Sequence, residues 1–324
     1  MVGTNDANFD KSITLWAHDS SHIVEDLWFD DGTLVITTEA ACFRIYGGHL
    51  AKESCIFRDM LQLCQPAGTK TIEQCPVVHL VDDSRDVEYF LKALLDHSFF
   101  LPFPAPTTFA IIAGVARLSK KYEVNTLYTR ALSHFASAFP VSPKEKVLCS
   151  WRQPGLSIPA ALLARELELD WALPIALYRV CAYSSTDEIL CGIDLDSFHF
   201  ELELNDKQSC LKECVLMRGA DSTNFMDFLW NPEKINGCMA PNVCKDRRLA
   251  RRKFIEVRRH FVLPFDLWTD DDWAGCVVCG PCLSAMRAAY NATLEKFWDS
   301  LPRRFALPAW DKLKERRCEA LELD

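Results

Sequence analysis

The sequence predicts an α+β fold, with a small N-terminal sheet flanked by helices and a mostly α-helical C-terminal domain. Up to residue 81, short apolar runs alternate with polar residues, a pattern typical of half-buried strands. From residue 84 onward, apolar residues recur at helical spacing, and this pattern continues to the C-terminus. The chain has 324 residues, enough for two modest domains, and its 49% hydrophobic content can fill their cores.

Four strands are predicted in the first domain. They are, in order, Val24–Phe29, Thr33–Thr37, Cys42–Tyr46 and Pro76–Val81. The first two are joined by Asp30-Asp31-Gly32, a turn signal that contains glycine. The stretch Gly68–Cys75 is polar, so a loop is expected there.

A pair of short helices should follow the third strand. Gly47-Gly48 interrupts the alternation, and paired glycines tolerate the positive φ that a sharp turn needs. A helical turn is expected at His49–Glu53, and Ser54 should then cap the next helix. The predicted buried face of that helix consists of Ile56, Phe57, Met60, Leu61 and Cys64, and Gln65-Pro66 should end it.

Helical patterns account for the rest of the chain. Asp82-Asp83-Ser84 offers caps for a helix whose buried stripe would be Val87, Phe90, Leu91 and Leu94. Further helices are predicted at Thr107–Ser119, at Asn125–Phe139, around Ala160–Leu167 and from Leu173, with Pro174 in a first turn. The prolines of Pro140–Pro143 mark a domain boundary.

The first domain resembles a BTB/POZ domain, of the type abundant in mushroom-forming fungi. The residues that match this family are Asp26–Phe29, Asp31-Gly32, Phe43, Arg44, Leu50, Ser54, Phe57, Asp59, Met60, Leu63, Gln65, Pro66, Asp82-Asp83 and Lys121-Tyr122. Tyr46 departs from the family, which usually has histidine there. In the C-terminal half, the phrase Leu173–Tyr178 and the run from Trp298 to Trp310 are also similar to that family.

The resemblance implies a domain organisation and a class of function. Residues 1–20 would be a flexible N-terminus, 21–140 the BTB/POZ domain and 141–324 the helical C-terminal domain. Such proteins are non-enzymatic protein–protein interaction modules or adaptors, and some present substrates to cullin-type ubiquitin ligases. Many relatives dimerise through an extra N-terminal strand, but the polar segment before Val24 does not resemble one. We therefore expect a monomer or a weak homodimer, and the protein partner is not identified by the sequence.

A group of cysteines in the C-terminal domain predicts a structural zinc site. Cys279 and Cys282 have the spacing with which two thiolates hold one tetrahedral zinc, and Cys238 and Cys244 would complete the four ligands. Cys276 should stay outside, because the family's Cys-x-x-Cys spacing before the Trp298 motif matches Cys279 and Cys282. Alternatively, these cysteines are small buried hydrophobic residues without metal, or, less favoured, a redox pair.

The segment Lys245–Arg259 has eight basic residues and two acidic ones. We interpret it as an amphipathic helix with a solvated basic face and a buried stripe formed by Ala250, Phe254, Val257 and Phe261. The alternative is a nuclear BTB regulator that contacts nucleic acid through residues 245–259 and the zinc knuckle. Nearby, Asp270-Asp271-Asp272 is interpreted as a solvated loop.

Composition and missing motifs exclude several classes of function. A net charge of −9 argues against a general nucleic-acid binder, which needs a basic face. There is no signal peptide or membrane-length apolar run, and 15 scattered cysteines suggest reduced thiols, so we expect an intracellular protein, cytoplasmic or nuclear. No hydrolase, nucleotide-binding or metalloprotease motif is present, so no enzymatic activity is expected. A cysteine nucleophile would require a histidine within hydrogen-bond reach.

Overall fold

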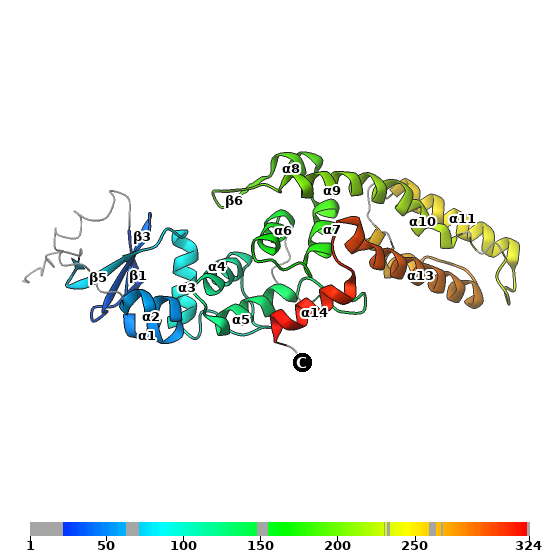
Figure 1. Cartoon of the computed structure of the whole chain (residues 1–324). Coiled ribbons are helices and arrows are strands. Elements are labelled where there is room, and N and C mark those ends of the chain that lie inside the picture. The colour runs from blue at the N-terminus through cyan, green and yellow to red at the C-terminus, as the bar shows by residue number, and fades with distance from the viewer. Residues whose placement is uncertain are drawn as a thin grey trace, which may run out of the picture. The chain divides into compact units, whose positions relative to one another are not determined.

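The computed structural model describes residues 22–62, 71–147, 155–229, 231, 234–258, 264–266 and 268–322. Contacts divide the chain into two compact units, residues 1–137 with 148–151, and residues 138–147 with 152–324. The first unit contains a small sheet with helices, and the second is mainly helical (Figure 1). The α+β class is therefore confirmed. The predicted flexible N-terminus, residues 1–20, lies outside the described residues.

The sheet of the first unit has the strand order β1-β3-β2-β5-β4. Its strands are β1 (His22–Trp28), β2 (Leu34–Thr37), β3 (Ala41–Ile45), β4 (Thr71–Ile72) and β5 (Cys75–His79). β2 and β3 form an antiparallel hairpin, in which Leu34 pairs with Ile45. β5 returns parallel to β2, and β1 lies parallel to β3. The four predicted strands are all present, and the hydrophobic side chains of β2 and β3 are buried.

β4 corrects the sequence prediction, which expected only a loop from residue 68 to 75. Thr71–Ile72 pairs antiparallel with the start of β5, and Glu73 and Gln74 form the turn between them with φ values of 47° and 65°. Glycine and asparagine usually occupy such positive-φ turn positions, so a Glu-Gln turn carries no sequence signal. Residues 68–70 of the predicted loop lie outside the described residues.

The predicted role of the glycine pair is also wrong. α1 (Gly47–Glu53) begins at these glycines, and neither has a positive φ. A Cβ at Gly47 would instead lie 3.2 Å from the Cβ of Leu34. Close backbone packing of α1 against β2, and not turn conformation, is what favours glycine at position 47.

Ser54 caps α2 (Cys55–Gln62) as predicted. Its Oγ accepts a hydrogen bond from the Phe57 amide at 3.1 Å and donates one to the carbonyl of Tyr122 at 2.6 Å. Phe57 is completely buried. The other described members of the predicted face, Ile56, Met60 and Leu61, are only half-buried. Cys64 and the helix end at Gln65-Pro66 lie outside the described residues.

Three longer helices complete the first unit: α3 (Ser84–Leu95), α4 (Phe109–Lys121) and α5 (Asn125–Ala136). Asp83 caps α3, since its carboxylate accepts from the amides of Arg85 and Asp86. The predicted stripe of Val87, Phe90, Leu91 and Leu94 is buried in full. Figure 1 shows α3 between the sheet and the α4–α5 pair.

The second unit is built from helices. They are α6 (Ser157–Glu166), α7 (Leu173–Tyr183), α8 (Thr186–Cys191), α9 (Leu204–Leu216), α10 (Ser222–Phe225), α11 (Pro241–Arg258), α12 (Asp270–Ala274), α13 (Gly280–Arg304) and α14 (Trp310–Leu321). A short hairpin, β6 (Ile193–Leu195) with β7 (Phe198–Phe200), was not predicted. Its three-residue strands are too short to show a period. The core is aromatic: the rings of Tyr178, Phe265 and Phe297 are in mutual contact.

Candidate metal centre

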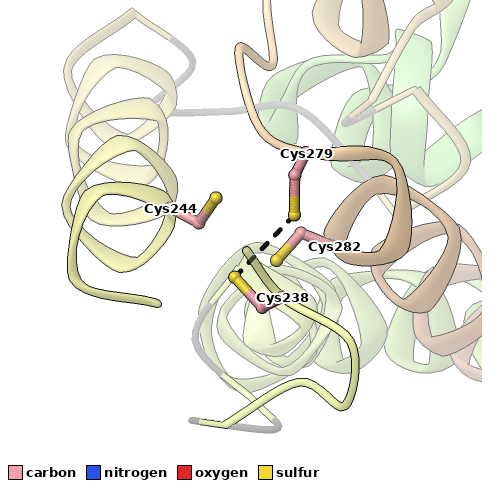
Figure 2. A group of neighbouring side chains, drawn as sticks. All are labelled: Cys238, Cys244, Cys279 and Cys282. Carbon is pink, nitrogen blue, oxygen red and sulfur yellow. Dashed lines mark hydrogen bonds between the residues drawn. The ribbon is translucent and has the colours of Figure 1, made fainter. Parts of the chain in front are cut away.

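Four cysteines gather where two helices of the second unit begin. Cys244 lies in the first turn of α11, Cys279 is the residue before α13, and Cys282 lies in the first turn of α13. Cys238 comes from the turn that precedes α11. Figure 2 shows that all four sulfur atoms point toward one another.

Local sequence explains why the chain turns sharply at this place. Gly237 has a φ of 76°, a conformation that glycine adopts at little cost, and it reverses the chain just before Cys238. Pro241 and Pro281 stand in the first turns of α11 and α13, where a missing backbone N–H costs nothing. Each helix therefore begins within a few residues of a cysteine, and its N-terminal turn carries a second one.

The sulfur geometry is compatible with one tetrahedral metal ion. The four Sγ atoms lie within 4.8 Å of one another, and the Sγ atoms of Cys279 and Cys238 are 3.8 Å apart. Zinc–sulfur bonds of about 2.3 Å place neighbouring sulfurs roughly 3.8 Å apart. A multinuclear iron–sulfur cluster carries its own sulfides between the ligand thiolates, so separations this short favour a single ion.

Burial and charge differ among the four thiols. Cys244 and Cys282 are buried, whereas Cys238 and Cys279 are half-buried. The backbone amides of Cys282 and Met239 lower the pKa of Cys279 to about 6, so this sulfur becomes a thiolate near neutral pH. Burial, together with the neighbouring sulfur of Cys238, raises the pKa of Cys282. A bound metal would displace the remaining protons, and the positive ends of two helix dipoles favour the resulting negative charge.

The structure thus brings together all four cysteines that the sequence singled out, and they could hold a metal ion. Cys276 is not a member of the group, and burial raises its pKa. The chemistry of the donors, four sulfurs at tetrahedral spacing, suits a structural site in which no ligand position is left open.

The predicted buried face of the basic helix is wrong. Ala250 is exposed and Phe254 is 41% exposed, whereas Cys244, Arg248 and Ile255 face the interior. Cys244 must face α13 to join the group. Arg248 and Ile255, four and eleven residues later, lie on the same side of the helix as Cys244. The other two members of the predicted stripe, the side chain of Val257 and Phe261, lie outside the described residues.

Several basic side chains of α11 bind to the protein itself. Arg251 forms a 2.8 Å ion pair with Asp272, and its guanidinium lies over the ring of Trp268. Arg247 donates to the carbonyl of Val277 at 2.9 Å, and Arg248 is only 2% exposed. The face of α11 that adjoins α12 and α13 is therefore stabilised by arginines.

Asp272 corrects a further prediction, because it does not belong to a solvated loop. It is 3% exposed, lies in α12 and accepts from the amide and hydroxyl of Thr269 as well as from Arg251. Sequence reasoning missed this pairing. The one available signal was the spacing of Arg248 and Arg251, four and seven residues after Cys244, which puts them on the cysteine's face of the helix.

A second group of thiols also escaped the sequence analysis. The Cys181 thiol on α7 donates to the Cys210 carbonyl on α9 at 3.5 Å, and the Cys214 thiol donates to the Cys181 carbonyl at 3.7 Å. These three cysteines are buried and act as small hydrophobic contacts between the two helices.

No protein-family model, curated protein or solved structure matches the chain. Among the described residues, no helix combines the length and the apolar character that a membrane span requires. The case for function therefore depends on the residues themselves.

Proposed function

We propose that the chain is a non-enzymatic protein–protein interaction adaptor of the BTB/POZ type, with a structural zinc in its second unit. One observation supports this most strongly: the motif residues that resemble the family, although far apart in sequence, are direct partners in the first unit. Tyr122 is the centre of this group, and it contacts three motif residues from two other segments.

The contacts of Tyr122 are specific. Its ring lies 4.4 Å from that of Phe57, its carbonyl accepts from Ser54, and its hydroxyl donates to Asp82 at 2.6 Å. Lys121 also binds Asp82 at 2.6 Å. Residues that matched a family pattern by chance would have no reason to contact one another, so this mutual contact supports the resemblance.

The same reasoning applies to the second unit. The indole N–H of Trp310 donates to the carbonyl of Trp298 at 2.8 Å, and their rings stack with centroids 4.9 Å apart. The amide of Leu307 donates to the carbonyl of Pro302 at 2.8 Å, which closes the turn between the two helices. The run from Trp298 to Trp310 is therefore one packed unit, in agreement with its resemblance to a family motif.

The contact region of the adaptor would be the α1–α2 pair and the edges of the sheet. Ile56, Met60 and Leu61 are only half-buried on α2, next to the exposed side chains of Arg58 and Asp59. Half-buried apolar residues bordered by charges are typical of protein-binding surfaces. A cullin-type ligase subunit is the partner class that the resemblance suggests.

Affinity purification with cross-linking mass spectrometry tests the adaptor function. Arg58→Glu changes the proposed surface, and Lys312→Glu makes the same change of charge on α14 in the second unit as a matched control. We expect proteins that co-purify with the wild type and with Lys312→Glu but are depleted with Arg58→Glu. Identical sets of co-purifying proteins for all three would contradict the proposed surface.

The zinc is tested by elemental analysis of protein purified without chelator. We expect about one equivalent per chain, lost in Cys279→Ser and retained in the matched variant Cys276→Ser. A zinc content below about a tenth of an equivalent in the wild type would show that the four cysteines form no zinc site.

The alternative of a nucleic-acid-binding regulator is not favoured by α11. Arg248 is buried and Arg251 is paired with Asp272, so these two arginines are poorly placed to neutralise phosphates. Duplex DNA binding that weakens strongly with added salt, and that Lys253→Ala abolishes, would support the alternative.

A further inference from the structure

Exposed apolar side chains flank the four cysteines. Met239 follows Cys238 and is 81% exposed, Val277 precedes Cys279 by two residues and is 64% exposed, and Val243 precedes Cys244 and is 48% exposed. Neighbouring positions on α11 add Ala250 and Phe254. We refer to Met239, Val243, Val277, Ala250 and Phe254 as the knuckle surface.

The α11 residues of the knuckle surface share one side of the helix, with Arg247 between Val243 and Ala250. Val243, Ala250 and Phe254 are separated by seven and four residues, so they lie on one side of the helix, opposite Ile255 and Arg248. This stripe covers about 16 Å at 1.5 Å per residue. Val277 adjoins its beginning, because its carbonyl accepts from Arg247, one turn after Val243.

The surroundings of this stripe are basic. From residue 245 to 258, α11 contains seven Lys and Arg residues and only Asp246 and Glu256 as acids. Arg247 and Lys253 lie on the exposed side, next to the apolar residues. This basic helix stands out in a chain whose net charge is −9.

We propose that the knuckle surface binds an acidic amphipathic helix of a partner protein. The apolar face of such a helix would cover the stripe, and its carboxylates would face Arg247 and Lys253, so that both shape and charge are complementary. The inference extends the proposed adaptor function, on which it rests, by giving the chemistry of a second partner site.

A second copy of the chain and nucleic acid would both fit the knuckle surface less well than an acidic helix. A second copy of the chain that packed α11 against α11 would bring two basic helices face to face, and like charges across an interface are unfavourable. Nucleic acid would meet an apolar stripe at the centre of the exposed face, where phosphate recognition requires donors.

The test is a selection of peptides from a displayed random library, with the full-length zinc-loaded protein as bait. We expect enriched sequences with apolar residues at i, i+3 or i+4 and i+7 and an excess of Asp and Glu. Against the double variant Met239→Ser, Val243→Ser, the best peptide should bind about tenfold more weakly. The matched control Val215→Ser removes a 74% exposed apolar residue from α9 and should bind normally.

Other outcomes overturn the proposal. They are the absence of any enriched peptide, peptides without an acidic excess, equal affinity for the double variant, or displacement of the peptide by duplex DNA. Dimerisation that the double variant abolishes would assign the surface to a second copy. Zinc content should be unchanged in the double variant. The Arg58→Glu purification tests a different surface, so failure of this inference is distinguishable from failure of the adaptor function.

Discussion

At the scale of single residues, Phe57 is a central part of the core of the first unit. Its ring is completely buried and lies against that of Tyr122, in the helix that Ser54 caps. Phe57→Ala should therefore reduce the free energy of unfolding by roughly 3–5 kcal/mol, the range for emptying a buried aromatic site. Urea denaturation measures this, with exposed Arg58→Ala as a control expected within about 0.5 kcal/mol of wild type. A loss below about 1 kcal/mol would show that the site collapses easily.

His134 predicts a pH dependence of stability in the first unit. It lies against the rings of Phe100 and Phe103, and its Nε2 is 2.8 Å from the carbonyl of Leu101. Burial lowers the pKa of His134, the Leu101 carbonyl partly opposes this, and the charge of Arg130 lowers the pKa further.

The direction of the effect follows from this shift. The folded-state pKa is below the unfolded value of about 6.5, so His134 contributes its full stabilisation above that value. The contribution is lost as the pH falls through the folded-state pKa. Urea titrations between about pH 7.5 and pH 5 should show a steeper loss for wild type than for His134→Gln. Equal slopes would contradict the assignment.

At the scale of elements, the cap of α3 is a separable contribution to stability. Oδ1 of Asp83 accepts from the amides of Arg85 at 3.0 Å and Asp86 at 3.3 Å. Asp83→Ala should cost about 1 kcal/mol in denaturant unfolding, because these amides lose their partner. Asp83→Asn keeps an acceptor oxygen and should be close to wild type. Equal losses in the two variants would show that charge, and not the hydrogen bonds, matters here.

The beginnings of α11 and α13 should respond together to metal removal. If one zinc joins them, a chelator should lower the thermal midpoint of the second unit by more than about 4 °C, equal to 1–2 kcal/mol for a domain of this size. Cys279→Ser should show no further decrease with chelator, whereas Cys276→Ser should behave like the wild type. A wild-type midpoint that does not depend on chelator would contradict a stabilising metal.

At the scale of the whole molecule, β1 bears on self-association. It pairs parallel with β3 of its own chain, with His22 opposite Ala41. The hydrogen-bonding side of β1 that faces β3 is therefore already satisfied within the chain. Sedimentation velocity at micromolar concentration should therefore give a species near the chain mass of 36.9 kDa, or a weak dimer. A stable dimer at sub-micromolar concentration would overturn this expectation.

Much of the fold could be predicted because its signals are local. The apolar runs of β2 and β3, the cap at Ser54 and the stripe from Val87 to Leu94 each depend on residues within a few positions. The cysteine group was also predictable, because ligand spacing and helix starts are sequence features. The β4 and β6 hairpins were missed, because their strands are short and their positive-φ turns contain no glycine.

The sequence by itself determined the four longer strands, several of the helices and which cysteines could meet. Only the tertiary structure decided the rotation of α11 about its axis. This rotation determines which of its residues are buried and which are exposed. Ala250 and Phe254 have the spacing of a core stripe, yet Cys244 and Arg251 turn the opposite face inward, toward Cys282 and Asp272. The physical reason is that an amphipathic pattern records which residues share a face, whereas burial of that face depends on distant partners.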